Sequence, residues 1–242
     1  MRNGTFSSSS IWKLATSGTS KGSIGADFYK YVNQVQNEID LQRSINKEAN
    51  GRSNTWGTFM EKYINDKNIL DMSEYVLVSE ERLKHPILTN WTGMPDVRGV
   101  KIKSVGDAKC PYSLEVFCAK IKALNKGVDE YKKQFKEDYW QLISNSILMN
   151  ENGIEVEYIQ PIIFCPYQSQ LDSIRTYQLT DKKFDNMNWL QYAKDSELPY
   201  LVETGKYKNL NIFTFPINKE DVEFLTERVV KAINMLEVKS VK

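Results

Sequence analysis

Residues 91 to 117 (WTGMPDVRGVKIKSVGDAKCPYSLEVF) place acidic and basic side chains close together in a pattern that predicts a β-hairpin. Asp107 and Lys109 are two residues apart on the second strand, so both side chains leave the same face, while Ala108 and Cys110 point toward the core. Pairing with the preceding strand would bring Asp96 onto the surface that carries Asp107. The hairpin is therefore expected to gather two carboxylates and an ammonium group on one face.

Two carboxylates at close range repel one another unless a cation lies between them. Oxygen ligands with octahedral geometry suit Mg²⁺ or Mn²⁺, and the neighbouring lysine can then contact a phosphate group or a metal-bound water. Hydrolysis of a phosphodiester needs an activated water, neutralised phosphoryl oxygens and a stabilised leaving oxygen, all of which two metal ions can supply. The alternative is an ordinary Asp-x-Lys ion pair on a surface hairpin, which contributes little to stability.

The hydrophobic pattern indicates the elements that would position this hairpin. Apolar residues at helical spacing predict helices at residues 28–39, 56–64, 113–126, 130–149 and 222–236. Short β-branched segments predict further strands at residues 75–79, 154–165, 173–179 and 209–215. Asn218 is expected to cap the last helix, with Asp221 in its first turn. Helices and strands alternate, so the fold class is α/β, or α+β with a mixed sheet.

Length and composition favour one domain. The chain has 242 residues, of which 41% are hydrophobic and 26% charged, which is enough for one substantial core. We expect a single domain over residues 1–242, in which residues 154–238 complete the fold around motifs that lie within residues 2–149. The sequence contains no run of 18 apolar residues that would predict a membrane span. The start of the chain lacks the apolar stretch of a signal peptide. A cytoplasmic location without membrane contact is therefore expected.

The remaining composition excludes several kinds of site. The three cysteines contain no C-x-x-C pair, so neither a disulfide framework nor a zinc or iron–sulfur site is indicated. His85 is the only histidine, which disfavours a His-metal nuclease or a zinc hydrolase. No G-x-S-x-G elbow and no P-loop spacing occur, so a serine hydrolase of that type and ATP hydrolysis are unsupported. The net charge of +1 does not indicate any particular class of binding partner.

The two acidic motifs, Pro95-Asp96 and Asp107-Ala108-Lys109, resemble the signature of the PD-(D/E)XK nuclease superfamily. Around them the chain is similar to the lambda-type exonucleases, also called the YqaJ viral recombinase family. The segments that carry this resemblance, in order, are RNGTFSSSS (2–10), WGTFMEKY (56–63), DAKCP (107–111) and DYWQLISNS (138–146). The resemblance implies a restriction-endonuclease-like α/β core, with a central mixed sheet flanked by helices.

The resemblance also implies a metal site. Asp96 and Asp107 would be metal ligands, with the Ala108 carbonyl as a candidate third ligand, and Glu61 would approach the same metals through bound water. Two Mg²⁺ ions are expected, and Mn²⁺ would substitute for them. Asp107 stands where lambda-type enzymes commonly have Glu, a shorter arm that still provides oxygen ligands.

Further roles are implied for residues around the metals. Lys109 would orient or deprotonate the attacking water, and Gln141 would hold the reaction site from the following helix. A second glutamine that the family often has is Ile143 here, which leaves Gln141 as the one candidate. Arg2 and Ser9 match positions that grip a terminal 5′-phosphate in this family.

A run of lysines could contact DNA. Lys132, Lys133 and Lys136 belong to a basic cluster that begins at Lys120, and such a cluster could track the phosphate backbone without reading bases. The alternative is a solvated lysine face balanced by neighbouring acidic residues. No helix-turn-helix, zinc-finger or basic-zipper signature indicates recognition of a sequence.

The function that the resemblance implies is metal-dependent digestion of linear double-stranded DNA in the 5′→3′ direction. The 3′ single strands left behind would serve a separately encoded single-strand annealing protein in phage-type recombination, within the bacterial host's cytoplasm if a phage encodes the chain. A homo-oligomer, a trimeric ring that threads DNA ends, is also implied. Two alternatives remain: a restriction-like or repair endonuclease on the same fold, and a non-catalytic DNA-binding or assembly protein.

Overall fold

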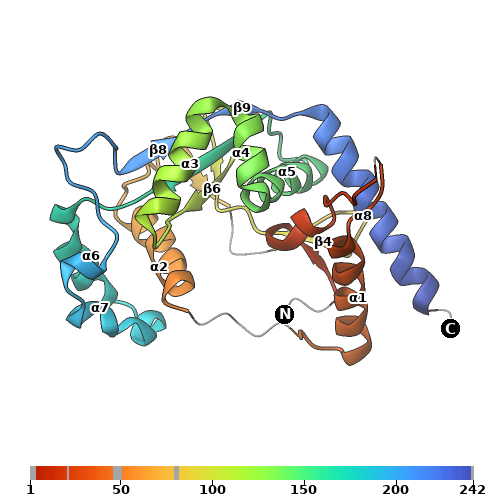
Figure 1. Ribbon diagram of the computed structural model, residues 1–242, viewed down its shortest axis with the longest axis horizontal. Coiled ribbons are helices and arrows are strands. Elements are labelled where there is room, and N and C mark those ends of the chain that lie inside the picture. Colours follow the sequence, from red (N-terminus) through yellow and green to blue (C-terminus); the bar gives the residue numbers. More distant parts are fainter. Residues whose placement is uncertain (1–3, 21, 46–50, 79–81, 241–242) are drawn as a thin grey trace.

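A central mixed sheet carries the acidic motifs in the computed structural model, which describes residues 4–20, 22–45, 51–78 and 82–240 (Figure 1). The strand order is β2-β5-β6-β7-β8, and β9 pairs with the other end of β7. β5 and β6 are antiparallel, β6 and β7 are parallel, and β7 and β8 are antiparallel. The strands are β2 (Tyr75–Leu77), β5 (Val97–Gly99), β6 (Ser104–Lys109), β7 (Tyr158–Phe164), β8 (Leu210–Ile212) and β9 (Phe215–Pro216).

The hairpin of β5 and β6 sets the position of the acidic residues. Val97 lies opposite Gly106, so Asp96, just before β5, lies at the end of the hairpin where Asp107 and Ala108 follow on β6. A Cβ at Gly106 would come within 2.6 Å of the Val97 side chain, so the close pairing at this point requires a glycine. The expected pairing of the two acidic motifs is confirmed.

A second, smaller sheet brings the start of the chain to the same region. Its order is β1-β4-β3, and β1 runs parallel to β4. The predicted hairpin over residues 91–110 is therefore limited to β5 and β6, because β4 pairs elsewhere. The members are β1 (Phe6–Ser7), β3 (Leu83–Lys84) and β4 (Trp91–Gly93), and the 3-10 helix η1 (Ser8–Lys13) follows β1 directly.

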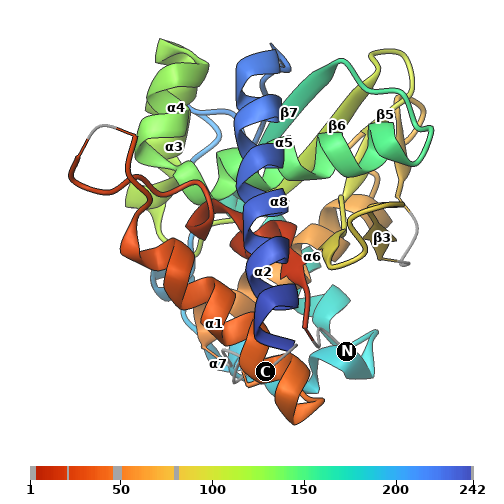
Figure 2. The ribbon, with the colours of Figure 1, turned by 90° about the vertical axis from the view of Figure 1, so that its right-hand side faces the viewer.

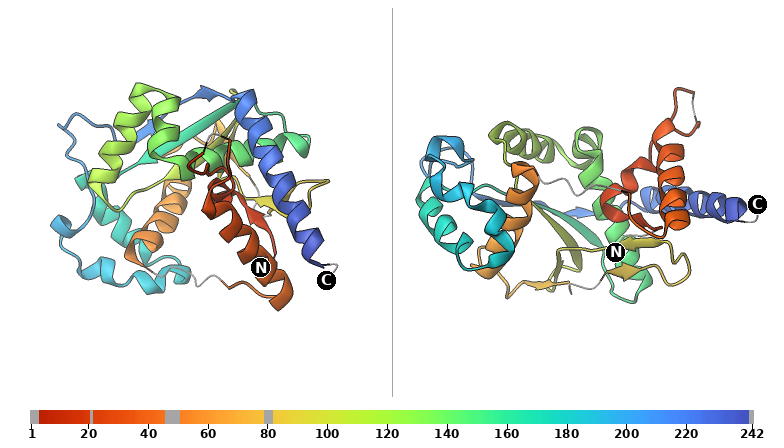
Figure 3. Two further views of the ribbon diagram at one scale, coloured as in Figure 1. Left: turned by 45° about the vertical axis from the view of Figure 1, so that its right-hand side comes forward. Right: turned by 90° about the horizontal axis from the view of Figure 1, so that it is seen from below.

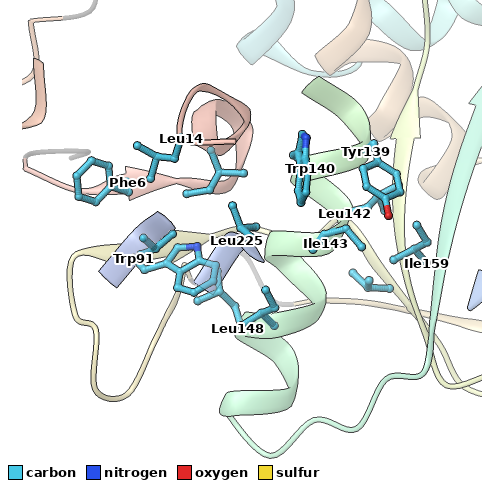
Figure 4. Packing of buried hydrophobic residues seen from close by; sticks show 14 of the residues in the cluster. Phe6, Leu14, Trp91, Tyr139, Trp140, Leu142, Ile143, Leu148, Ile159 and Leu225 are labelled. Atoms are coloured by element: carbon cyan, nitrogen blue, oxygen red, sulfur yellow. The ribbon is translucent and has the colours of Figure 1, made fainter. Parts of the chain in front are cut away.

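Two hydrophobic clusters cover the two faces of the central sheet. Side chains of β6 alternate between them, since Val105 lies in one cluster and Ala108 and Cys110 lie in the other. Asp107 and Lys109 therefore share the face of Val105, as expected. The long helix α5 packs on this face, where its Tyr139, Trp140, Leu142, Ile143 and Leu148 belong to the first cluster (Figure 4).

Helices surround the sheet at its two ends. α1 and α8 contact one another on the right of Figure 1, and α2, α6 and α7 gather on the left. Figure 2 views the molecule from the side of α1 and α8, with α2 behind them, and the separation of the two groups is visible again from below (Figure 3, right). Within the described ranges, no helix combines the length and the hydrophobicity that a membrane span requires. The helices are α1 (Ala26–Leu41), α2 (Arg52–Asp66), α3 (Leu114–Lys126), α4 (Val128–Gln134), α5 (Lys136–Glu151), α6 (Leu171–Gln178), α7 (Trp189–Tyr192) and α8 (Lys219–Ser240), with 3-10 turns η2 (Gln168–Gln170), η3 (Lys182–Met187) and η4 (Asp195–Glu197).

Two predictions of secondary structure are wrong. Residues 173–179 were expected as a strand, but they lie largely in α6, where Leu171, Ile174 and Tyr177 recur every three residues on the buried side. The helix expected over residues 130–149 is broken at Phe135, whose φ of −125° and ψ of 52° are not helical. The predicted cap of the last helix is confirmed, since Asn218 Oδ1 accepts a hydrogen bond of 2.9 Å from the Glu220 amide.

Candidate active site

The acidic motifs meet at the end of the β5–β6 hairpin. Asp96 Oδ2 accepts a hydrogen bond of 2.8 Å from the Ala108 amide, which fixes the first motif against the second. Lys109 Nζ lies 2.6 Å from Asp107 Oδ2, and the Asp107 residue is only 1% exposed. The structure thus brings both carboxylates and the ammonium group together in a largely buried position.

Gln141 joins this group from α5. Its Nε2 donates a hydrogen bond of 2.8 Å to Asp107 Oδ1, and its Oε1 accepts one of 3.2 Å from Lys109 Nζ. A single amide therefore holds both side chains of the second motif. This bridge fixes where the carboxylate and the ammonium group point.

Glu61 of α2 completes the wall of one cavity. The cavity has a volume of about 130 Å³, and all five predicted catalytic side chains line it. Its lining residues are Ser7, Ser8, Ser9, Glu61, Arg82, Gly93, Met94, Asp96, Asp107, Lys109 and Gln141.

Burial and mutual repulsion shift the acidity of these groups. Burial raises the pKa of Asp96 well above its usual range, and the charges of Asp107 and Glu61 raise it further. Burial also raises the pKa of Glu61 to about 7, although the charge of Lys109 opposes the change. Burial by itself lowers the pKa of Lys109, but the neighbouring carboxylates outweigh it, so the pKa lies above its usual range and the ammonium stays charged. The three carboxyl groups therefore lie close enough to repel one another, with Lys109 and Arg82 as the cationic residues of the same cavity lining.

Comparison with known proteins identifies the fold. No family model matches the chain, and no curated protein matches its sequence. The crystal structure of an alkaline exonuclease (LHK-Exo) from Laribacter hongkongensis is 13% identical, with a TM-score of 0.60 over 98% of this chain and 90% of that chain. The structure of LHK-Exo in complex with dAMP has the same identity and coverage, with a TM-score of 0.59. A phage related exonuclease from Haemophilus somnus 129PT is 15% identical, with a TM-score of 0.60 over 98% of this chain and 96% of that chain.

This chain has the fold of these exonucleases. The α/β core that the motifs implied, a central mixed sheet flanked by helices, is confirmed. The likeness to phage-related and alkaline exonucleases also confirms the resemblance drawn from the motifs, at the level of the fold.

The donor atoms of the cavity fit a magnesium ion. Asp107 Oδ2 is buried and receives no hydrogen bond of good geometry from any described residue, although Lys109 Nζ is close to it. Across the described ranges, no three His, Cys, Asp or Glu side chains form a ready-made metal cluster. Mg²⁺ does not need one, because it is usually held by one or two carboxylates together with waters and substrate phosphates. Asp96 and Asp107 can supply those carboxylates, with Glu61 in the same cavity.

Of the two residues expected to bind a 5′-phosphate, Ser9 belongs to the described part of the chain and Arg2 does not. Ser9 is an exposed residue of η1 at the wall of the cavity, and its Oγ lies 3.2 Å from Ser7 Oγ. The segment is anchored through Ser8, whose Oγ is 2.8 Å from Ser144 Oγ of α5. Arg2 lies outside the described residues.

The lysines expected to contact DNA differ from one another in the structure. Lys132 forms an ion pair of 2.6 Å with Asp221 of α8, so the Asp221 carboxylate already compensates its positive charge. Lys136 is exposed, with its Nζ 4.6 Å from the centre of a Trp12 ring, and Lys133 is exposed on α4. Lys133 and Lys136 are therefore the exposed members of the three.

Two charged residues near the site were not predicted. Arg82 lines the cavity from the segment before β3, and no local motif marks it. The carboxylate of Asp138 accepts a hydrogen bond of 3.0 Å from the Tyr131 hydroxyl and pairs with the Lys120 ammonium, which buries the lysine where the basic cluster was expected to begin. Asp138 could have been found from its spacing, since it stands three residues before Gln141 on one face of α5.

Proposed function

We propose that this chain is a metal-dependent exonuclease that degrades linear double-stranded DNA. The observation that supports it best is the convergence of Glu61, Asp96, Asp107, Lys109 and Gln141 on one cavity. These residue types suit hydrolysis of a phosphodiester without histidine. The fold of alkaline and phage-related exonucleases, shared over 98% of the chain, supports the same reaction.

Asp96 and Asp107 would hold Mg²⁺ or Mn²⁺, with Glu61 reaching it through bound water and the Ala108 carbonyl beside it. When bound, two such ions would activate water and neutralise the phosphoryl oxygens. Bound cations would offset the repulsion between these carboxyl groups, which together with burial raises the pKa values of Glu61 and Asp96 in the metal-free protein.

Lys109 would orient the attacking water or a phosphoryl oxygen. Its pKa is raised above its usual range, so it is an ammonium group at neutral pH and donates hydrogen bonds rather than accepting a proton. Gln141 would keep this donor and the Asp107 carboxylate in a fixed relation through its two hydrogen bonds. Such fixed groups contribute to the rate by holding the reactants in position.

We further propose 5′→3′ polarity and a 3′ single-stranded product that an annealing protein uses in phage-type recombination. The ordered motifs shared with lambda-type exonucleases support this, as does Ser9 at the wall of the cavity. A homotrimeric ring around the DNA is part of the same proposal.

Digestion of linear and covalently closed circular duplexes tests the proposed function. An exonuclease removes nucleotides from the linear duplex and leaves closed circles uncut. Nicked or linearised circles would instead favour the restriction-like endonuclease. No cleavage of either DNA with Mg²⁺ or Mn²⁺ would favour the non-catalytic DNA-binding protein.

A further inference from the structure

A large groove continues from the catalytic cavity. It has a volume of about 930 Å³ and shares Ser9, Glu61, Met94, Lys109 and Gln141 with the cavity. One wall is a face of α2, and the other is the segment that leads from β6 into α3. Most of the remaining lining is polar and uncharged, with Ser10, Ser53, Asn54, Thr58, Tyr112 and Ser113.

Gly57 on α2 lines this groove, and no contact with the described residues requires a glycine there. It lies inside the helix, where glycine is destabilising relative to alanine. Its φ is not in the left-handed region. A Cβ built there would meet no described atom within 4 Å beyond its chain neighbours and its own helix backbone.

The glycines of the nearby sheets differ in this respect. A Cβ at Gly93 would come within 2.3 Å of Ser8 Oγ, and one at Gly99 within 2.2 Å of Ser104 Oγ. Packing inside the protein accounts for those glycines. At Gly57 the space that a side chain would occupy belongs to the groove.

The space beside Gly57 lies close to the candidate catalytic residues. Gly57 precedes Glu61 by four residues, so both lie on one face of α2, one turn apart. The cavity at the end of this groove holds Asp107, whose buried Oδ2 lies 2.6 Å from Lys109 Nζ. The groove that Gly57 lines therefore opens directly onto the side chains of the proposed catalytic site.

Given the proposed nuclease function, on which this inference rests, we propose that the DNA strand being cut passes over Gly57. Its sugar–phosphate backbone contacts the bare helix backbone of α2, one turn from the scissile phosphate. Hydroxyl and amide side chains such as Ser53, Asn54 and Thr58 commonly bind phosphate and sugar oxygens without reading sequence. The missing side chain lets the strand come close enough for these contacts.

Substitution of Gly57 tests the proposal, because the described residues leave room for a side chain there. Gly57→Ala should fold with unchanged or higher stability, and its kcat/KM on linear duplex should fall by about tenfold. Gly57→Leu should lower kcat/KM by about a hundredfold, since displacement of a bound substrate by about 1 Å can cost this much. Because a backbone contact carries no base information, the losses should be the same on A·T-rich and G·C-rich ends.

Gly51→Ala is the matched control. Gly51 immediately precedes α2, a Cβ there also meets open space, and it is outside the described lining of the groove. Its digestion rate should stay within about twofold of wild type. Thermal unfolding of each variant checks that the fold is intact.

Equal digestion by wild type, Gly57→Ala and Gly57→Leu would overturn this inference and leave the proposed function standing. Losses that differ between A·T-rich and G·C-rich ends would overturn the backbone contact. A wild type that digests no duplex would overturn the proposed function instead. In that case the affinity of each variant for the same labelled duplex decides the inference, which requires weaker binding by Gly57→Leu and fails if binding is equal.

Discussion

The raised pKa of Glu61 predicts that the metal-free protein loses stability as the pH rises. The pKa is about 7 in the folded protein against an ordinary value of 4.5, and burial is the main cause. The folded protein therefore holds this proton more tightly than the unfolded chain does. The stabilising effect is complete below pH 4.5 and is lost between pH 4.5 and about 7. The total is about 3 kcal/mol, because each pKa unit corresponds to about 1.4 kcal/mol.

Glu61→Gln removes this ionisation and so isolates the effect. In a buffer with a metal chelator, the variant should be more stable than wild type by about 3 kcal/mol at pH 8, and the difference should shrink toward zero near pH 4.5. Urea unfolding between pH 4.5 and 8.5 measures the free energies. Glu227→Gln, at an exposed position of α8, is the control and should follow wild type at every pH.

A free-energy difference between Glu61→Gln and wild type that does not change with pH would refute this reasoning. It would mean that the Glu61 carboxylate is as well solvated in the folded protein as in the unfolded chain. Addition of Mg²⁺ gives a second reading, since an ion that binds only the folded protein stabilises it. At pH 8 the ion should raise the stability of wild type more than that of the variant.

Three further outcomes are expected. Lys109→Ala should lower the single-turnover rate by at least about a hundredfold while changing DNA affinity little, because a positioned charge acts mainly in the transition state; equal losses in rate and affinity would contradict this role. Removal of the 5′-phosphate should slow digestion of linear duplex, and Ser9→Ala should shrink that difference; identical wild-type rates on both kinds of end would exclude the phosphate pocket. Trp91→Phe should cost about 1–3 kcal/mol in urea unfolding, because it removes the 2.8 Å hydrogen bond from Trp91 Nε1 to the buried Ser144 hydroxyl; unchanged stability would show that this bond is not needed.

The hairpin of the catalytic motif could be predicted because its signal is local. Alternation along β6 places Asp107 and Lys109 on one face whatever surrounds them, and the structure has them in contact. Gln141 and Glu61 each lie more than 30 residues from Asp107 in the chain, so spacing alone could not place them. Only the order of motifs shared with lambda-type exonucleases suggested that they meet the hairpin.

The errors have equally physical causes. The segment around Ile174 is rich in β-branched and aromatic residues, but contacts of Leu171 and Tyr177 with the second hydrophobic cluster select a helix. Lys120 was expected at the surface because neither of its partners, Asp138 and the Tyr131 ring, is adjacent to it in sequence. Local propensity could not reveal either tertiary contact.

The most direct test of the proposed function is digestion of a linear duplex labelled at the 5′ or the 3′ end, with and without Mg²⁺, by wild type and by Asp107→Asn. Wild type should digest the DNA only with Mg²⁺, and early release of the 5′ label would establish the proposed direction. Asp107→Asn should fold and still bind DNA but digest it about a thousandfold more slowly, because the charge stabilisation supplied by a metal ion is worth several kcal/mol. An Asp107→Asn variant that keeps more than about a tenth of the wild-type rate in Mg²⁺ would contradict the assignment of this cavity as the nuclease centre.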